Sequence, residues 1–213
     1  MSQIENKINK KILNKIKLQK PFVEKDLLHN IFSWSELENL LNLRPFITAS
    51  RFHIAKKPIN ERFEWPMQSW LSDINTIPPK FLHNIVEERV CSFSDASRVN
   101  KSINEICGII ETATSWPTDA HIYFSKKVQQ EGFGKHKDEA HNLIVQVEGK
   151  SNFQVWSIDN KIIIDEDMLP GDCVFIPAHI NHKILPCTPR ISVSFPMWLK
   201  PGPPPQDRYW INF

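Results

Sequence analysis

The residues best suited to chemistry lie in one short stretch, 132–138, which reads Gly-Phe-Gly-Lys-His-Lys-Asp. His136 and Asp138 are two residues apart, and side chains at that spacing point to the same side of an extended strand. An imidazole and a carboxylate are two of the three protein ligands of a 2-His-1-carboxylate metal site, which leaves coordination positions open for other molecules. The pair alone is a weak signal, because a surface histidine and aspartate can share this spacing.

A second stretch, 170–182, supplies further histidines. A glycine–aspartate turn, a short apolar run and Pro177 precede His182, which follows the proline by five residues. This arrangement resembles the second signature motif of cupins, in which the histidine after the strand is a metal ligand. The stretch departs from that motif at His179, where a second glycine is usual. The resemblance therefore implies His182 as the third ligand, with His179 as the alternative.

The surroundings of the first pair resemble the metal-binding strand pair of JmjC-type hydroxylases and ribosomal oxygenases. The residues that carry this resemblance are His136, Asp138, Asn142, Gln146 and Gly149, with the upstream Ile122-Tyr123 strand and the Glu131-Gly132-Phe133 turn. Plain cupins use HxH and a downstream glutamate, whereas this chain has Asp138 and, near the glutamate position, Leu143. The resemblance covers residues 118–198 well and the N-terminal part only in general layout. It implies an enzyme that binds Fe(II) and uses 2-oxoglutarate and O₂ as cosubstrates to hydroxylate an unactivated C–H bond.

The far carboxylate of 2-oxoglutarate needs a cation, because an unpaired buried charge is very costly. JmjC-type enzymes often place a lysine or arginine fifteen residues after the first histidine, and that position here is Ser151. Arg190, followed by Ser192, lies eight residues after His182 and resembles the Arg-x-Ser anchor of prolyl-hydroxylase-type oxygenases. A guanidinium suits a two-pronged grip on a carboxylate. Arg190 and Ser192 are the predicted anchor, and a surface salt bridge is the alternative for the arginine.

Two more residues are candidates for binding the cosubstrate. Asn142 matches a position that contacts it near the metal in some JmjC-type hydroxylases, and Tyr123 lies on a strand that could line the pocket. For both, hydrogen bonding within the core is the alternative. A cluster around the first ligands predicts a solvated rim or a contact surface for an acidic substrate; its members are Lys135, Lys137, His141 and Lys150.

The scaffold for these residues is a series of short β-type segments after Pro117, separated by glycine, proline and aspartate. The predicted strands are 120–124, 143–147, 153–157, 161–164, 173–176, 183–185 and 190–198. Such spacing predicts a β-sandwich or barrel. With the resemblance, the expected fold is mainly β with N-terminal helices, around a double-stranded β-helix (jelly-roll or cupin) core.

The first part of the chain has helical periodicity. Isoleucines recur every four residues from Ile4 to Ile16 and predict an amphipathic helix over residues 2–20. A second helix is predicted over 98–113, and Ser33 or Ser35 is a plausible N-cap for a short helix that follows. The other predictions in this part are an extended piece at 20–23, a strand at 45–54 and an irregular stretch at 63–80. The expected organisation is one structural domain: 1–117 as N-terminal support, 118–200 as the catalytic core and 201–213 as a proline-rich tail.

The composition narrows the function classes. With 213 residues and a net charge of +2, the chain has no global basic character that would indicate nucleic acid or an anionic membrane. Four cysteines without a CxxC pair, and neither a secretory leader nor a membrane-spanning run, predict reduced thiols in a cytoplasmic protein. The family resemblance favours a protein or peptide substrate, with a small molecule as alternative, and a homodimer. A metal cupin that does not use 2-oxoglutarate and a non-catalytic binding module are the other functions considered.

Overall fold

The computed structural model describes residues 3–8, 10–43, 51–54, 79–128 and 134–198. Several predictions lie outside these residues: most of the strand at 45–54, nearly all of the irregular stretch at 63–80, the Glu131-Gly132-Phe133 turn and the proline-rich tail at 201–213.

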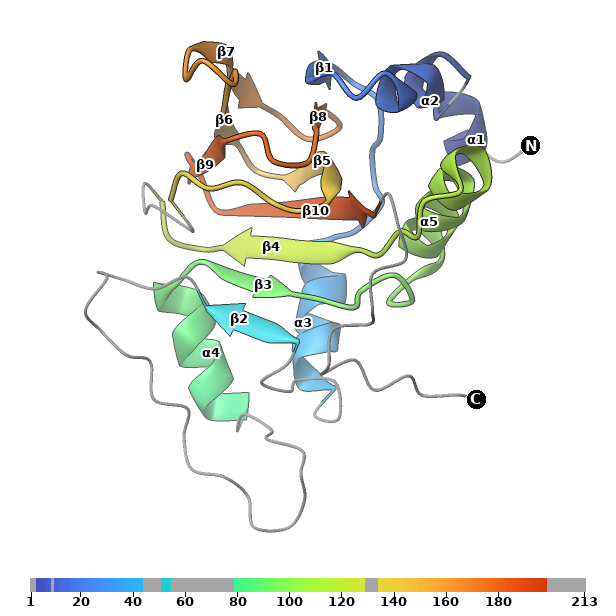
Figure 1. Ribbon diagram of the computed structural model, residues 1–213. Helices are drawn as coiled ribbons and strands as arrows, with labels where there is room; N and C mark the ends of the chain where they lie inside the picture. The colour runs from blue at the N-terminus through green and yellow to red at the C-terminus, as the bar shows by residue number, and fades with distance from the viewer. Residues whose placement is uncertain (1–2, 9, 44–50, 55–78, 129–133, 199–213) are drawn as a thin grey trace.

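Two antiparallel sheets make up the core of the molecule (Figure 1). The larger sheet has the order β1 (Phe22–Glu24), β8 (Cys173–Ile176), β5 (His141–Glu148), β10 (Arg190–Met197), β4 (His121–Ser125), β3 (Cys91–Phe93) and β2 (Phe52–Ile54). The smaller sheet has the order β7 (Ile162–Met168), β6 (Ser151–Trp156) and β9 (His182–Pro186). All seven strands predicted after Pro117 are present, and the mainly β, jelly-roll-type fold is confirmed. Since β1, β2 and β3 precede residue 118, the N-terminal region also contributes strands to the larger sheet.

Five helices are found in the described residues. They are α1 (Gln3–Lys7), α2 (Lys10–Lys17), α3 (Trp34–Asn42), α4 (Pro79–Glu88) and α5 (Lys101–Thr114). The first periodic segment forms two helices rather than the single helix predicted, but Ile8, Ile12 and Ile16 are buried as its stripe requires. Ser33 is the N-cap of α3, where its hydroxyl accepts the backbone N–H of Glu36 at 3.3 Å. Helix α4 and strand β3 were not predicted.

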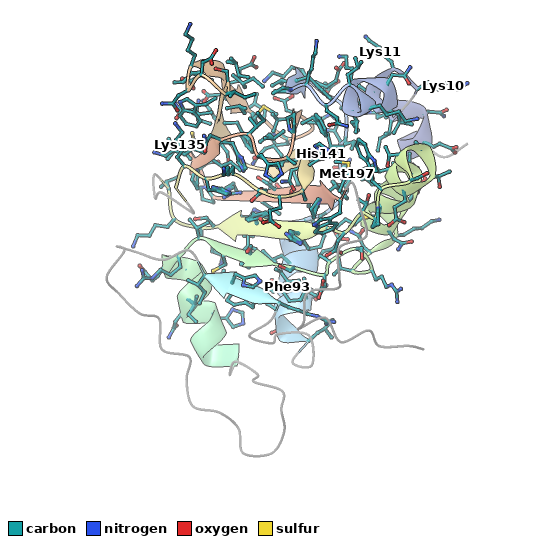
Figure 2. All side chains as sticks on the ribbon, in the orientation of Figure 1. Lys10, Lys11, Phe93, Lys135, His141 and Met197 are labelled. Carbon is teal, nitrogen blue, oxygen red and sulfur yellow. The ribbon has the colours of Figure 1, made fainter. Side chains whose placement is uncertain are left out.

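The larger sheet is buried on both faces at its centre. On β5 and β10, one face carries Leu143, Val145, Ile191, Val193 and Phe195, which join the main apolar cluster with the N-terminal helices. His141 and Met197 are paired across these two strands and share that outer face, near the middle of the molecule (Figure 2). Strand β10 is buried along its whole length, because the polar residues that alternate with its apolar ones are also buried, on the inner face.

The inner face of the larger sheet packs against the smaller sheet through a second apolar cluster. Its buried members are Ile144, Phe153, Val155, Met168, Val174 and Ile176. Strands β1, β8 and β5 are thus covered by apolar residues from β6 and β7. The inner face of β10 instead carries Arg190, Ser192 and Ser194, which are all buried. This change from apolar to polar lining marks where a binding pocket can form.

The four cysteines are free, and Cys91, Cys107 and Cys173 are buried. Burial raises the pKa of each of these three thiols, so they stay protonated and unreactive at neutral pH. Within the described part of the chain, no helix is both long enough and apolar enough to cross a bilayer.

Gly149, in the turn from β5 to β6, is predicted to tolerate no side chain. Its φ is +67°, and a Cβ built there would lie 1.9 Å from the carbonyl oxygen of Pro189. Because that obstacle is backbone, Gly149→Ala should lower the free energy of unfolding by about 3 kcal/mol or more, as measured by urea denaturation. Gly108→Ala is the matched control. This helical glycine has open space around its Cβ position, so the change should raise stability by about 0.5–1 kcal/mol. Equal effects of the two substitutions would contradict the prediction.

Candidate metal centre and cosubstrate pocket

The predicted metal ligands come from a segment without regular strand structure, which holds His136 and Asp138, and from the first residue of β9, His182. His136 and His182 form an isolated antiparallel bridge, in which each backbone N–H donates to the other residue's carbonyl, at 3.0 and 2.8 Å. The segment around His136 and Asp138 was expected to be extended, yet the described residues 134–140 form no strand beyond this bridge. The convergence therefore comes from pairing with the start of β9 and not from alternation along a strand.

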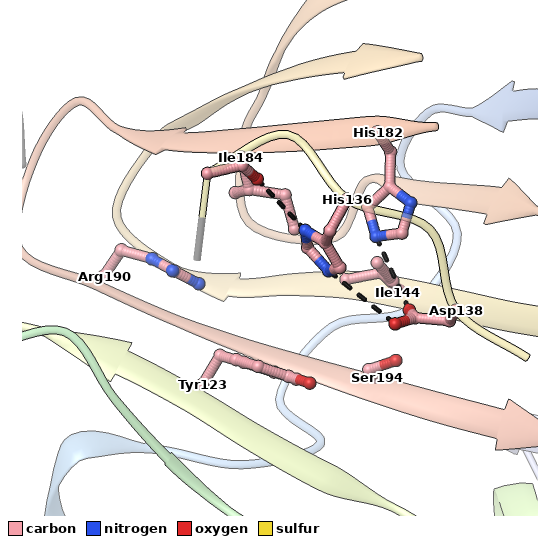
Figure 3. A pocket seen from close by; sticks show the side chains of 9 residues that line it. Tyr123, His136, Asp138, Ile144, His182, Ile184, Arg190 and Ser194 are labelled. Atoms are coloured by element: carbon pink, nitrogen blue, oxygen red, sulfur yellow. Dashed lines mark hydrogen bonds and ion pairs between the residues drawn. The ribbon is translucent and has the colours of Figure 1, made fainter. Parts of the chain in front are cut away.

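The side chains of His136, Asp138 and His182 point toward one another at one side of a pocket (Figure 3). Nε2 of His136 lies 3.7 Å from one Asp138 carboxylate oxygen, and Nε2 of His182 lies 3.5 Å from the other. One donor atom from each of the three residues falls within 4.8 Å of the others. Ligands at about 2.1 Å from a shared cation and at right angles are about 3 Å apart, so small adjustments would suffice to surround one ion.

Hydrogen bonds orient both imidazoles for such a role. Nδ1 of His136 donates to the Gly134 carbonyl at 3.0 Å, and Nδ1 of His182 donates to the Ile180 carbonyl at 3.1 Å. In each ring the remaining nitrogen, Nε2, then carries the lone pair that a metal requires. Burial, reinforced by nearby His136, lowers the pKa of His182. The buried imidazole is therefore neutral at neutral pH, which is the form that binds metals.

His179, the alternative third ligand, does not join this group. Its side chain is exposed, and its backbone has a left-handed φ of +63°. This conformation explains why a glycine is usual at this position of the motif. Its backbone N–H donates to the Asp138 carbonyl at 2.7 Å, so this residue contributes to the site through its main chain.

Arg190 lies at the other end of the same pocket, away from Asp138 (Figure 3). It is 2% exposed, and its Nη1 donates to the Ser192 hydroxyl at 3.0 Å, while its Nε has no hydrogen-bond partner in the described structure. Burial lowers the pKa of Arg190 to about 10, with Tyr123 acting in the opposite direction, so the guanidinium stays charged at neutral pH. Within the described residues no carboxylate forms an ion pair with it. A buried cation without a counter-ion is costly, and an anionic ligand in the pocket would remove that cost.

Comparison with known proteins shows the family of this chain. The JmjC domain matches residues 92–200, slightly more than half of the chain. The chain belongs to the JmjC domain family. No curated protein matches the sequence.

The solved structures similar to this JmjC domain include the Escherichia coli ribosomal oxygenase YcfD. Its complex with cobalt and 2-oxoglutarate is 18% identical over 85% of this chain, with a TM-score of 0.61. Its complex with cobalt and succinic acid is 20% identical over 85%, with a TM-score of 0.63. A further YcfD structure is 20% identical over 90%, with a TM-score of 0.64. The matches cover 48%, 49% and 52% of YcfD, so this chain spans about half of its length.

Asn142 of the JmjC domain lies behind Asp138. Its amide donates to an Asp138 carboxylate oxygen at 2.7 Å and accepts the Ser194 hydroxyl at 3.0 Å. These hydrogen bonds form a chain that orients the Asp138 carboxylate, and the contact of Asn142 with a cosubstrate stays a prediction. Since this amide donation leaves the second carboxylate oxygen free, Asp138 can still bind a metal.

Ser192 and Tyr123, the other two predicted cosubstrate residues, are positioned differently. The Ser192 hydroxyl accepts from Arg190 and donates to the Gln146 side chain at 2.8 Å, so it holds the guanidinium in place. Tyr123 lines the pocket between the metal ligands and Arg190. Burial, with the Asp138 charge, raises the pKa of Tyr123 well above its usual value, so the phenol keeps its proton as a hydrogen-bond donor.

Sequence reasoning missed two residues with site roles and misplaced one. Gln146 had been matched to the family pattern but assigned no role, and Ser194 had not been considered. Ser194 continues the two-residue spacing of Arg190 and Ser192 along β10, and this periodicity could have revealed it. His141, expected on a solvated rim, is buried and stacked on Trp116.

Proposed function

We propose that this JmjC domain protein is an Fe(II)- and 2-oxoglutarate-dependent oxygenase that hydroxylates an unactivated C–H bond, with a protein side chain as substrate. One observation carries the proposal. A pocket with a 2-His-1-carboxylate donor group on one side has on the other a buried arginine for which the described residues provide no counter-ion. The first feature suits a divalent metal, and the second suits the far carboxylate of a dicarboxylate cosubstrate.

The proposed metal ligands are His136, Asp138 and His182, a donor set typical of non-haem Fe(II) oxygenases. Bound Fe(II) would supply a site at which O₂ reacts with 2-oxoglutarate, whose decarboxylation drives hydroxylation of the substrate. The chain's own contribution is orientation. The Gly134 and Ile180 carbonyls fix the two imidazole rings, and Asn142 fixes the carboxylate. By family resemblance, the retained Asp138 favours hydroxylation, because related halogenases lack this carboxylate to make room for halide.

Arg190 is the proposed anchor of the cosubstrate. Its hydrogen bond to Ser192, and the onward bond to Gln146, hold the guanidinium on the inner face of the sheet. Tyr123 offers a phenolic donor beside it, while Ile144 and Ile184 add apolar walls that exclude water. In such a low-dielectric site, a charge-assisted contact to a carboxylate is stronger than the same contact in water.

The class of substrate rests on resemblance. YcfD, whose fold this chain shares, is named a ribosomal oxygenase, and this agrees with a protein substrate. Since the chain spans about half of that protein, the substrates of YcfD are not assigned to it.

Anaerobic titration with Fe(II) and 2-oxoglutarate tests the proposal. The wild-type protein should develop a visible charge-transfer absorbance only when both are present, and under O₂ it should convert 2-oxoglutarate to succinate. His136→Ala should abolish both signals, and thermal unfolding would show whether the variant is folded. Metal binding without any effect of 2-oxoglutarate would favour a metal cupin of another activity. Absence of metal binding would leave a non-catalytic binding module.

A further inference from the structure

The loop that carries His182 is tied to the rest of the site by one side chain outside the pocket. Nδ1 of His141 accepts the backbone N–H of Ala178 at 2.9 Å. The other ties found in the described residues are backbone hydrogen bonds, from His179 to the Asp138 carbonyl, between His136 and His182, and from Trp156 to the Asn181 carbonyl. Among these contacts, only the one at Ala178 depends on the chemistry of a side chain.

His141 cannot reach the pocket from its position. It begins β5 on the outer face, in the same row as Leu143 and Val145, whereas Ile144 lines the pocket from the inner face. Its neighbour across the sheet is Met197 on β10 (Figure 2). Any influence of this side chain on the predicted metal ligands is therefore indirect, and its hydrogen bond with the Ala178 N–H provides one route.

The surroundings of His141 fix the ring in one orientation. The side chain is 2% exposed and lies between two aromatic rings, with centroids 5.0 Å from Trp116 and 5.9 Å from Phe175, each nearly parallel to it. Burial and the two stacked contacts restrict movement of the ring away from Ala178. Its Nδ1 thus provides a rigid acceptor.

The other ring nitrogen, Nε2, indicates that His141 does more than fill space in the core. Since Nδ1 accepts a hydrogen bond, the proton of the neutral ring is on Nε2, and this buried atom has no hydrogen-bond partner in the described structure. An unpaired buried donor is unfavourable, and a phenylalanine would fill the same aromatic gap without it. Leaving the buried Nε2–H without an acceptor costs free energy. A histidine at this position is explained if its Nδ1 is needed as the acceptor for the Ala178 N–H.

We propose that His141 is a positioning residue, which sets the metal affinity of the site by holding the Ala178–His179 turn between Asp138 and His182. The turn is held on one side by His141 and on the other by the Asp138 carbonyl, and His182 lies three residues after His179. Residues that orient metal ligands from behind typically change metal affinity about 10–100-fold when altered. This inference rests on the proposed function for its metal readout, but its geometric part does not.

Two substitutions at this position separate positioning from packing. His141→Phe keeps the aromatic stack and removes the acceptor, whereas His141→Asn removes the stack and keeps an oxygen where Nδ1 lies. For His141→Phe we expect Tm within a few degrees of wild type and Co(II) affinity, measured by calorimetry, about 10–100-fold weaker. For His141→Asn we expect Tm lower by about 4 °C or more and Co(II) affinity within about threefold of wild type. A purely structural role would instead make metal affinity follow Tm, and that result would overturn the inference.

Hydrogen exchange of the metal-free protein provides a readout that does not depend on the proposed function. The amides of residues 177–182 should exchange faster in His141→Phe than in wild type, and His141→Asn should keep most of the protection. Unchanged exchange in His141→Phe would overturn the inference even if the wild-type protein binds metal. If the wild-type protein binds no Co(II) but the exchange rates differ as expected, the proposed function fails and the positioning of the loop stands.

Discussion

Arg190→Met should make the apoprotein more stable and at the same time prevent it from binding 2-oxoglutarate. The guanidinium is buried, charged and without a carboxylate partner in the described structure, so an apolar side chain of similar length should raise the free energy of unfolding by about 1–4 kcal/mol. The same change removes the cation that the cosubstrate needs, and such losses cost about 2–5 kcal/mol. At 1.4 kcal/mol for each factor of ten, 2-oxoglutarate affinity should fall by at least about 30-fold.

The measurement for Arg190→Met is 2-oxoglutarate binding to the Co(II)-loaded protein, with Co(II) affinity itself expected within about threefold of wild type.

Ser151 provides a test of whether a cation at another position can replace Arg190. It begins β6, is fully buried, and its hydroxyl has no hydrogen-bond partner in the described part of the chain. By family resemblance, a lysine is often found there. Arg190→Ser combined with Ser151→Lys should therefore recover at least tenfold of the affinity lost in Arg190→Ser. Retained 2-oxoglutarate affinity in Arg190→Met would contradict the proposed anchor.

The strands after Pro117 could be predicted because their local signals agree with the fold. The run 173–176 is apolar and bounded by Gly171 and Pro177, and it forms β8 with the predicted limits. Arg190 and Ser192 were predicted from an Arg-x-Ser resemblance, and their spacing of two places both on one face of β10. These features depend on the period of two and on turn residues, which are properties of neighbouring positions.

Long-range pairing was the part that the sequence did not reveal. The short strands β2 and β3 gain their hydrogen bonds only by joining the edge of a sheet built from residues far along the chain, and three-residue segments carry almost no periodicity. His141 shows the same limit at the level of one residue. From the sequence, a histidine near the predicted metal ligands is expected on an exposed rim, and its buried position is revealed only by its stacking with Trp116 and Phe175.

His182→Ala should weaken Co(II) binding and His179→Gly should not, although the two histidines are only three residues apart. His182 is buried with its Nε2 facing Asp138, so its loss removes one of three proposed ligands and should weaken Co(II) binding by more than about 100-fold.

His179 is exposed and contributes only its backbone N–H to the Asp138 carbonyl. Glycine keeps this hydrogen bond and relaxes the positive φ, so His179→Gly should leave Co(II) affinity unchanged and stability equal or higher by up to about 1 kcal/mol. Calorimetric titration of Co(II) into both variants checks these two predictions. Since removal of a buried imidazole could unfold the protein, Asp138→Ala, which alters a side chain 40% exposed, is a second test of the same ligand set. Strong metal binding by a folded His182→Ala or Asp138→Ala variant would exclude the proposed ligands, whereas loss of binding in His179→Gly would show that the third ligand had been assigned to the wrong histidine.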